Sequence, residues 1–313
     1  HMWTRRQRQM CIRDSSSKWL EKEINEISKI ENLTVKTRTS IAAYHGYNYL
    51  LARENLTDHL SIKDKKDKIR QRLWKIRAKK VIVATGAIER PLVFNNNDRP
   101  GILLSNSINK YLDYYGVACG KNIILFTNND SAYETAISLH KKGIKNLIVD
   151  LRKNSLSEIA KQAQNLGIKI YFNHVVTNTF GYRRINSVEL MELSDDGNTT
   201  IGNKIKLNCD CLGISGGWTP MVHMHTQSGG KLDFKNDDQV FIPKEIDNDQ
   251  ISVGSCNGDF DLETIIDKTV NKINIFLDIN NQDYKNTKVD CSIEKEKRNI
   301  WLLPNKIPVS YTH

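Results

Sequence analysis

The sequence predicts an α/β protein with two parallel sheets, the second inserted into the first. Short apolar runs end in small residues at 80–86, 209–217 and 250–258, as buried strands do when they stop in tight turns. Between the first and second of these runs, residues 121–150 read as strand, helix and strand. That order is the repeating unit of a parallel sheet.

The first part of the chain contains a helix, a strand meander and the first apolar run. Leu20, Ile24 and Ile27 follow helical spacing, and a serine precedes them as a cap. The run of Lys residues at 63–68 is expected to be a solvated turn. The expected elements are a helix at 17–30, strands at 33–44, 47–53 and 70–76, and a buried strand at 80–83.

The tripeptide Ala84-Thr85-Gly86 follows the buried strand and carries almost no side-chain bulk. Glycine adopts backbone conformations closed to other residues, and small side chains let a ligand approach the main chain. Ligands of open parallel sheets sit beyond the carboxyl ends of the strands. We therefore expect a ligand to bind at this end of the strand. The strand ends at Gly217 and after Val253 are expected to contribute to the same binding edge.

The inserted part alternates strands and helices after a turn-rich crossing at 95–101. A hairpin is expected around Asp195-Asp196-Gly197. The strand at 210–215 is expected to return to the first sheet. The expected elements are helices at 105–115, 131–142, 155–166 and 261–277, and strands at 121–126, 145–150, 168–173, 184–193 and 199–207.

The turn at 127–132 in this second sheet lacks the glycines of a phosphate-binding turn. The side chain of Asn129 would fill the space that a pyrophosphate needs. Asp130 places a carboxylate at the helix start, where it suits a cap and repels an anion. Asp150, at the ribose-binding position, is then expected to be a relic or a surface charge. We predict that this degenerate dinucleotide fold binds no nucleotide.

A dinucleotide fold opens with a strand, a glycine-rich turn and a helix. No G-x-G-x-x-G occurs in the sequence, so the opening unit is expected to lie upstream of a fragment. Residues 1–16 and the last residues resemble translated adapter sequence, and we expect them to be non-native or without order.

Composition excludes several classes of protein. The net charge is +10, yet no dense basic block alternates with aromatic residues, which argues against nucleic-acid binding. No apolar run approaches the ~20 residues that cross a bilayer. Cys209 and Cys211 are spaced to share one face of a strand, but no second Cys or His pair at zinc spacing accompanies them. Buried thiols of a cytosolic protein are expected.

No group of residues in the sequence has the types and spacing of a catalytic site. His223 and His225 would share one side of a strand, but no third metal ligand follows, so core or surface histidines are expected. Glu89-Arg90 fits either a hinge salt bridge or a phosphate contact. We therefore assign no catalytic residue and no metal ligand.

Three longer stretches carry a family resemblance. ATGAIERPLVFNNNDRPGILLSNSINKYLDYYGV, FTNNDSAYETAISLHKKG and GGWTPMVHMHTQSGGKL resemble the alpha subunit of heterotetrameric sarcosine oxidase, from about Ser17 to about Pro304. The resemblance implies an FAD/NAD(P)-binding, Rossmann-like three-layer fold. Its expected parts are 17–98 and 209–280 for the first dinucleotide-binding domain, 99–208 for the inserted domain, and 281–313 for a connector to a missing domain.

The family's activity follows as an implication of the resemblance. Sarcosine is oxidatively demethylated to glycine, with hydrogen peroxide and methylene-tetrahydrofolate as further products. NAD is expected in this chain, FAD and FMN elsewhere in the complex, and tetrahydrofolate in the missing C-terminal domain. Beta, gamma and delta-type subunits are the expected partners, in the cytoplasm. The chain alone is expected not to oxidise sarcosine.

The resemblance also implies NAD contacts. Ile41 aligns with the adenine edge, and Ser255, Phe260 and Leu262 align with contacts at the start of the helix after the last strand. They join Ala84, Thr85, Gly86 and Gly217 from the strand exits. Core packing is an equally good interpretation of Phe260 and Leu262.

Two other functions stay open. The first is a subunit of a related FAD-dependent amine or imino-acid dehydrogenase, of proline or opine type. Flavin-binding members end the last strand in Gly-Asp, whereas Gly254 is followed here by Ser255, which argues against FAD. The second is a non-catalytic scaffold whose nucleotide is structural. A flavin disulfide reductase is excluded because no C-x-x-C occurs.

Overall fold

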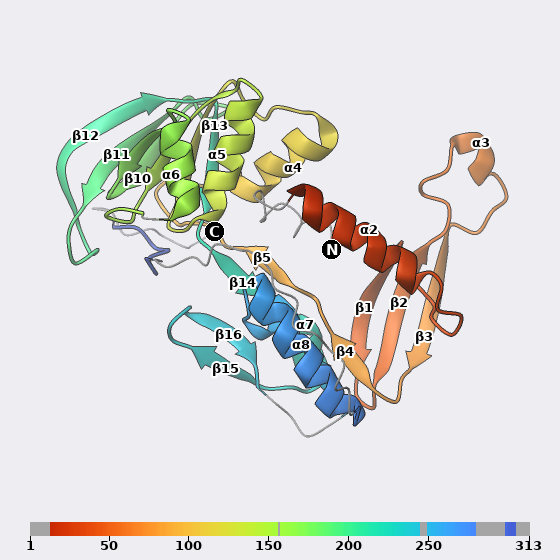
Figure 1. Ribbon diagram of the computed structural model, residues 1–313. Helices are drawn as coiled ribbons and strands as arrows, with labels where there is room; N and C mark the ends of the chain where they lie inside the picture. The colour runs from red at the N-terminus through yellow and green to blue at the C-terminus, as the bar shows by residue number, and fades with distance from the viewer. Residues whose placement is uncertain (1–12, 156, 245–248, 280–297, 305–313) are drawn as a thin grey trace. The chain divides into compact units, whose positions relative to one another are not determined.

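A computed structural model describes residues 13–155, 157–244, 249–279 and 298–304 (Figure 1). They form two compact units. Unit 1 contains residues 13–88 and 219–279, and unit 2 contains residues 89–218 and 298–304. The chain thus leaves unit 1 and returns to it, as an inserted domain requires. The insertion begins before the expected residue 99 and ends after the expected residue 208.

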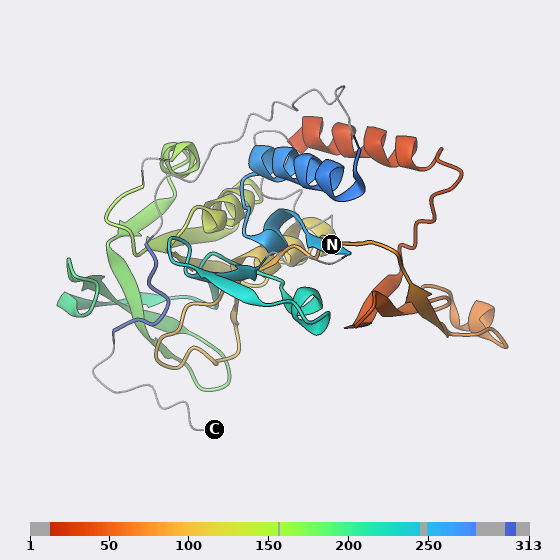
Figure 2. The same ribbon diagram turned by 90° about the horizontal axis from the view of Figure 1, so that it is seen from below.

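Unit 1 combines a three-stranded antiparallel sheet, a parallel strand pair and a hairpin. The sheets are β1-β2-β3, β4-β17 and β15-β16. In both views α3 lies at the outer end of the connection from β2 to β3 (Figures 1 and 2). The elements are α2 (Arg13–Ile27), β1 (Thr39–His45), β2 (Tyr49–Asn55), α3 (Ile62–Lys65), β3 (Gln71–Arg77), β4 (Val81–Val83), α7 (His223–Gln227), β15 (Leu232–Lys235), β16 (Val240–Pro243), β17 (Gln250–Ser252), the 3-10 helix η3 (Gly254–Asn257) and α8 (Leu262–Leu277).

The predicted elements of unit 1 are present, with shifted ends. The strand expected at 33–44 begins only at Thr39, because β2 ends at Asn55 and Glu54 is the partner of Thr39. Val35 is 62% exposed. The expected turn at 63–68 contains the short helix α3, because the Ser61 side chain accepts a hydrogen bond from the Asp64 amide.

The buried core of unit 1 is small. Tyr44, Val83 and Cys256 form its buried cluster, with Leu50 and Met224 among the partly buried side chains around it. The cluster joins the antiparallel sheet to β4 and to η3. Two hydrogen bonds add to this link: the Gln227 side chain accepts from the Tyr44 amide at 3.1 Å, and the Asn48 side chain donates to the Asp249 carbonyl at 3.0 Å.

Unit 2 is built on a five-stranded parallel sheet in the order β6-β13-β7-β8-β9, with an antiparallel sheet β10-β11-β12. Strands β5 (Ala87–Glu89) and β14 (Trp218–Pro220) are the two connecting segments and pair with each other. The elements are β6 (Ile102–Leu104), α4 (Ser105–Tyr115), β7 (Asn122–Thr127), α5 (Ser131–Lys141), β8 (Lys145–Asp150), α6 (Glu158–Asn165), β9 (Lys169–Phe172), β10 (His174–Phe180), β11 (Ser187–Leu193), β12 (Thr200–Asn208) and β13 (Cys211–Ser215).

Unit 2 has three layers, because alternate residues of its parallel strands face different partners. Ile123 and Leu125 of β7 pack in the cluster that contains the apolar faces of α4, α5 and α6. Ile124 and Phe126 pack in a second cluster with residues of β10 and β11 such as Val175. Period-two alternation in a strand buried on both faces explains this division. The predicted helix at 105–115 and strand at 145–150 are confirmed at both ends.

One expectation for unit 2 is wrong, and one strand was not predicted. The strand predicted to return to the first sheet, β13, instead pairs in parallel with β6 and β7 of unit 2. Its fully buried residues fit the centre of that sheet, where strands need cover on both faces. The sequence reading also missed β10, which carries a bulge between Val176 and Asn178. A bulge interrupts the alternation that would reveal a strand.

None of the helices in the described part of the chain is long and apolar enough to span a membrane.

Candidate functional site

Two parallel strands of unit 1 end at the same edge. β4 and β17 run side by side, with Val81 opposite Gln250 and Val83 opposite Ser252. The Val253 amide donates to the Val83 carbonyl at 2.9 Å, which extends the pairing beyond the last strand residues. The carboxyl ends of parallel strands are where an α/β sheet offers its backbone to a ligand.

The chain leaves β4 through a turn that contains Gly86, and hydrogen bonds to the main chain of Met221 hold this turn. Gly86 has φ +83°, a conformation that L side chains rarely adopt. Its carbonyl accepts from the Met221 amide at 2.9 Å, and the Thr85 hydroxyl donates to the Met221 carbonyl at 2.7 Å. Residue 221 therefore fixes the turn, and the sequence reading missed this role. Because φ is positive here, a side chain at residue 86 would strain the backbone.

The exit of β17 is also glycine, followed by a buried serine. Gly254 has φ +73°, and Ser255 in η3 is 3% exposed. The Cys256 thiol lies 3.3 Å from the Val83 carbonyl, so η3 contacts the end of β4 directly. The two exits are thus next to each other, with Ala84, Thr85 and Gly86 following β4 and Ser255 following β17.

The remaining predicted contacts of unit 1 lie on β1 and at the start of α8. Ile41 of β1 is 42% exposed, and Phe260 and Leu262 are half-buried. The Asp261 carboxylate accepts from the Thr264 amide at 2.9 Å and caps α8. A capped helix start already carries a negative charge, so it suits a neutral part of a ligand better than a pyrophosphate.

Gly217 does not share this edge. It follows β13 and therefore lies at the end of a strand in the sheet of unit 2. Its φ is +91°, and its carbonyl accepts from the Arg90 amide at 2.8 Å. The expectation that three strand exits converge on one edge is therefore wrong, because β13 stays in the inserted sheet.

The corresponding edge of unit 2 is filled by side chains. Asn129 is 2% exposed, and its amide group donates to Asn128 and to the Ser215 carbonyl. Its Oδ1 accepts from the Ser131 amide at 2.8 Å. Asn129 therefore occupies the helix-start amide that a phosphate would use.

Asp130 is not the cap that the sequence suggests. Its side chain makes no capping hydrogen bond to α5, and its Oδ1 lies 2.8 Å from the Arg152 guanidinium. The same guanidinium lies 2.7 Å from Asp150, which also accepts from the Tyr133 hydroxyl at 2.7 Å. The expectation of a surface charge at Asp150 is wrong, because this carboxylate is fully buried.

Burial governs the titration of this cluster. It raises the pKa of the Asp150 carboxyl, while the Arg152 hydrogen bonds and charge act in the opposite direction. Burial and the neighbouring Asp150 carboxylate also raise the pKa of the Tyr133 hydroxyl. Because Asp130 and Asp150 both form ion pairs with Arg152, neither carboxylate is available to bind a ribose. The spacing Asp150-Leu151-Arg152 is the sequence signal that could have revealed the pair.

Residues 298–303 cover the same region of unit 2. The Arg298 guanidinium donates to the Leu151 carbonyl at 2.8 Å, directly after β8. The Asn128 amide donates to the Arg298 carbonyl at 3.1 Å, and the Trp301 indole donates to the Gly216 carbonyl beyond β13. This segment thus contacts the ends of three strands, and it falls in the range expected to be a connector.

The other candidate residues have structural contacts. His223 and His225 lie on helix α7 rather than on a strand, so a spacing of two residues separates their side chains. His225 is 3% exposed. Glu89 Oε2 accepts from the Asn106 amide at 2.9 Å, and the Arg90 guanidinium lies 4.3 Å from the Trp301 ring. Among the described residues, no group of His, Cys, Asp or Glu could hold a metal ion.

The thiols on β13 and just before it are buried. Cys209 is 4% exposed and Cys211 is fully buried. Burial raises the pKa of each thiol to about 12. Thiolates are the reactive form of cysteine, so neither side chain suits redox chemistry at neutral pH.

Comparison with known proteins identifies relatives. The chain is 34% identical over 243 residues to sarcosine oxidase subunit alpha of Corynebacterium sp. (strain U-96), which covers 78% of this chain and 25% of that protein. The subunit alpha of Rhizobium meliloti (strain 1021) is 31% identical over 70% of this chain and 21% of its own length. The chain thus spans about a quarter of the length of these curated relatives. No family model matches the sequence.

Solved structures agree on the fold. The flavoprotein disulfide reductase RclA from Escherichia coli, as its Cu(II) complex, has a TM-score of 0.56 at 15% identity, over 85% of this chain and 55% of its own. Thioredoxin reductase from T. acidophilum has a TM-score of 0.52 at 16% identity, over 77% and 72%. The chain is therefore a homologue of sarcosine oxidase subunit alpha with the fold of FAD/NAD(P)-binding oxidoreductases.

Proposed function

We propose that this homologue of sarcosine oxidase subunit alpha binds NAD at the β4–β17 edge of unit 1, as the dinucleotide-binding portion of an oxidoreductase subunit. The observation that carries the proposal is the pair of exits at Gly86 and Gly254, both at positive φ and joined through Cys256 and Val83. Two neighbouring strand ends that each contain a glycine present main chain that a dinucleotide can approach.

The residues of the edge fit the separate parts of NAD. Ile41 is half-exposed on β1 and supplies main chain to the adenine. Ala84, Thr85 and Gly86 pass along the middle of the cofactor. Phe260 and Leu262, beside the capped start of α8, contact an uncharged part. When bound, NAD supplies a nicotinamide that accepts or donates hydride.

Ser255 favours NAD over FAD at this edge. A flavin-binding member needs a carboxylate at this position to accept a hydrogen bond from the sugar chain of the flavin, and a serine hydroxyl is a neutral substitute. The curated relatives support a role in sarcosine oxidation. We propose that the complete complex demethylates sarcosine to glycine with peroxide and methylene-tetrahydrofolate, using FAD, FMN, tetrahydrofolate and beta, gamma and delta-type subunits. This chain alone is predicted not to oxidise sarcosine.

The test is the identity of the nucleotide that the complete subunit carries. The purified subunit is denatured, and the released nucleotides are separated by chromatography and identified by mass spectrometry. NAD at about one molecule per chain is the expected result. Released FAD without NAD would favour the amine or imino-acid dehydrogenase alternative, and a subunit that carries neither would contradict the proposal.

A further inference from the structure

Most of the positive charge of the chain lies around one strand of unit 1. Residues 63–80 contain ten Lys or Arg and two Asp, a net charge of +8 out of the +10 of the whole chain. This range begins in α3 and ends just after β3. Figure 1 shows β3 at the outer side of the sheet β1-β2-β3. A surface with this charge attracts acidic partners.

Strand β3 has an edge without a neighbouring strand. In the part of the chain that the structure describes, β3 pairs with β2 and with no other strand. Just beyond one end of the pairing, the Leu56 amide donates to the Arg70 carbonyl at 2.9 Å. Beyond the other end, the Ala78 amide donates to the Asn48 carbonyl at 3.1 Å. Because hydrogen-bonded pairs alternate with other pairs in an antiparallel ladder, the even-numbered residues of β3 bond to β2. The amides and carbonyls of the odd-numbered residues, 71 to 77, therefore point to the outer edge.

The side chains of the odd-numbered residues lie on the outward face of the sheet. Trp74 lies opposite the fully buried Ala52, so the even-numbered residues share the inward face. Leu73 is 61% exposed, and Lys75 and Arg77 are exposed as well.

These two basic side chains have no acidic partner among the described residues. Arg70 and Arg72 do have one, since they form ion pairs with Asp58 and Glu54. The Arg77 guanidinium contacts the ring of Tyr49, at 5.6 Å from its centre. The charge of Lys75 and Arg77 is thus available to an acidic group beside the outer edge.

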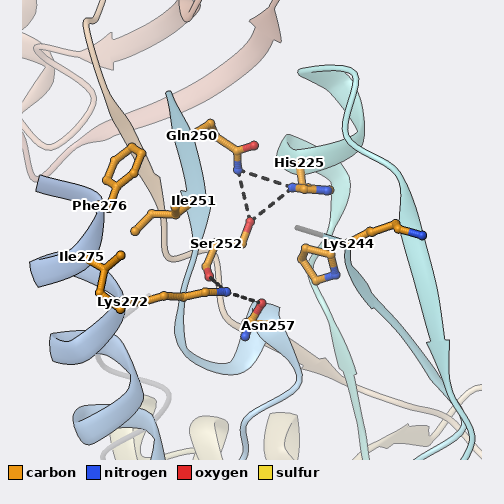
Figure 3. Close-up of a pocket in the computed structure, with 10 residues that line it drawn as sticks. His225, Lys244, Gln250, Ile251, Ser252, Asn257, Lys272, Ile275 and Phe276 are labelled. Carbon is orange, nitrogen blue, oxygen red and sulfur yellow. Dashed lines mark hydrogen bonds between the residues drawn. The ribbon is translucent and has the colours of Figure 1, made fainter. Parts of the chain in front are cut away.

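The cavity of about 260 Å³ beside β17 does not offer a comparable edge (Figure 3). On one side of this strand, His225 Nδ1 lies 3.4 Å from Gln250 Nε2 and 3.5 Å from the Ser252 hydroxyl. On the other side, Figure 3 shows Ile275 and Phe276 of α8. β17 is three residues long, whereas β3 has seven. Side chains of other elements thus lie on both sides of β17, and β3 is the longer and more exposed edge.

The charge of the outer edge decides which partner it accepts. Charged side chains on an edge strand normally prevent it from pairing with another copy of itself. A second β3 would bring Lys75 and Arg77 of two copies together, and the like charges would repel. An acidic strand reverses the sign of this interaction. Nucleic acids and anionic membranes also supply negative charge, but they lack a row of amides and carbonyls that matches a strand edge.

We propose that the outer edge of β3 binds an extended acidic segment of another polypeptide, which adds a strand to the sheet β1-β2-β3. The main chain of this segment pairs with the odd-numbered residues of β3. Its acidic side chains lie beside Lys75 and Arg77, and the side chains between them lie beside Trp74 and Ile76 on the other face. Ile41 of the NAD edge lies on β1, at the opposite side of the sheet, so the proposal does not depend on the proposed function.

The experiment uses a fluorescein-labelled, acetylated octapeptide of alternating Glu and Val as the probe. Its fluorescence anisotropy is titrated with the complete purified subunit. Lys75→Glu is expected to weaken binding at least tenfold. The matched control is Lys145→Glu, which makes the same change of charge at the exposed start of β8 in unit 2, and it is expected to bind like the wild type. Equal affinities of these two variants would overturn the proposal.

A second pair of variants tests the main chain. Proline is tolerated on an edge strand where its nitrogen faces outward. Leu73→Pro removes one outward amide and is expected to weaken binding at least tenfold, whereas Leu73→Ala keeps the amide and should stay within threefold of the wild type. Circular dichroism checks that each variant is folded. Wild-type affinity in a folded Leu73→Pro variant would rule out strand addition.

Two further probes test the chemistry of the partner. An octapeptide of alternating Lys and Val has the same backbone and the opposite charge, and no saturable binding is expected. A labelled octamer of deoxythymidylate has negative charge without a peptide backbone, and it is expected to bind at least tenfold more weakly than the acidic peptide. Binding of the basic peptide, or an equal affinity for the oligonucleotide, would contradict the assignment of an acidic polypeptide.

Discussion

The two units present the same kind of sheet edge with opposite contents. In unit 1 the strands β4 and β17 are followed, two or three residues later, by Gly86 and Gly254, both at positive φ. In unit 2 strand β7 is followed by Asn129 and strand β8 ends in Asp150, and both side chains are buried and hydrogen-bonded within the protein. A parallel sheet alone therefore does not define a nucleotide site, because the residues after the strands decide whether main chain is accessible.

Charge separates the two edges as well. In unit 2 the Arg152 guanidinium lies 2.8 Å from Asp130 and 2.7 Å from Asp150. The ionic groups that would meet a nucleotide are thus paired with each other. At the edge of unit 1, the described contacts of Ala84, Thr85 and Gly86 include no such ion pair. The comparison predicts that unit 1 binds the nucleotide and that unit 2 has a structural role.

The largest expected effect is on the stability of unit 2. Arg152→Ala leaves two carboxylates near each other, one of them fully buried. Breaking a buried pair by removing one partner costs about 3–5 kcal/mol. Chemical denaturation followed by fluorescence measures the loss. Lys153→Ala is the control, since Lys153 forms an exposed ion pair with Asp195, and no measurable change is expected. Equal stabilities of the two variants would remove the structural role assigned to this cluster.

The next effect concerns nucleotide occupancy. Gly86→Val adds a β-branched side chain at φ +83°, with a backbone strain of about 1–3 kcal/mol. It also fills the surface where the cofactor is expected. Bound NAD per chain after gel filtration should fall strongly, while circular dichroism shows that the inserted domain stays folded.

A matched substitution controls for strain alone. Gly143 in unit 2 has φ +73°, and a Cβ there would meet nothing within 4 Å. Gly143→Val therefore carries a similar backbone strain without approaching the proposed edge, and NAD occupancy should stay at the wild-type value. Wild-type occupancy in a folded Gly86→Val variant would place the cofactor elsewhere.

A smaller effect is expected at the turn of unit 2. Asn129→Gly supplies the glycine that a phosphate turn needs, but it leaves the Asp130–Arg152–Asp150 cluster in place. NAD affinity of the complete subunit, measured by calorimetric titration, should stay within threefold of the wild type. A tenfold change, about 1.4 kcal/mol, would identify unit 2 as the binding unit.

The smallest effect concerns thiol reactivity. Burial raises the pKa of Cys209 and Cys211 to about 12, so both remain protonated thiols at pH 8. Iodoacetamide labelling followed by peptide mass spectrometry should modify them only after addition of denaturant. Rapid labelling of the native protein would show that the sheet of unit 2 opens more readily than its buried core indicates.

Local pattern predicted much of the fold and only part of the candidate site. Helix α4 and strand β8 were predictable because capping, spacing and apolar runs are local properties. The sheet to which β13 belongs was not, since a buried strand ending in glycine looks the same in either sheet. Likewise, Asp150 reads as a surface acid until Arg152 and Tyr133 are placed around it. Both outcomes depend on which residues lie nearby in the folded chain, and the residue types alone do not reveal these neighbours.

The most direct test locates the adenine of NAD on the chain. The complete subunit is incubated with a photoreactive azidoadenine analogue of NAD, irradiated, digested and mapped by mass spectrometry, with excess NAD as competitor. Our account predicts a labelled peptide that contains Ile41, and loss of the label when NAD competes. Competed labelling within residues 127–152 instead would place the nucleotide on unit 2 and contradict the assignment of the β4–β17 edge.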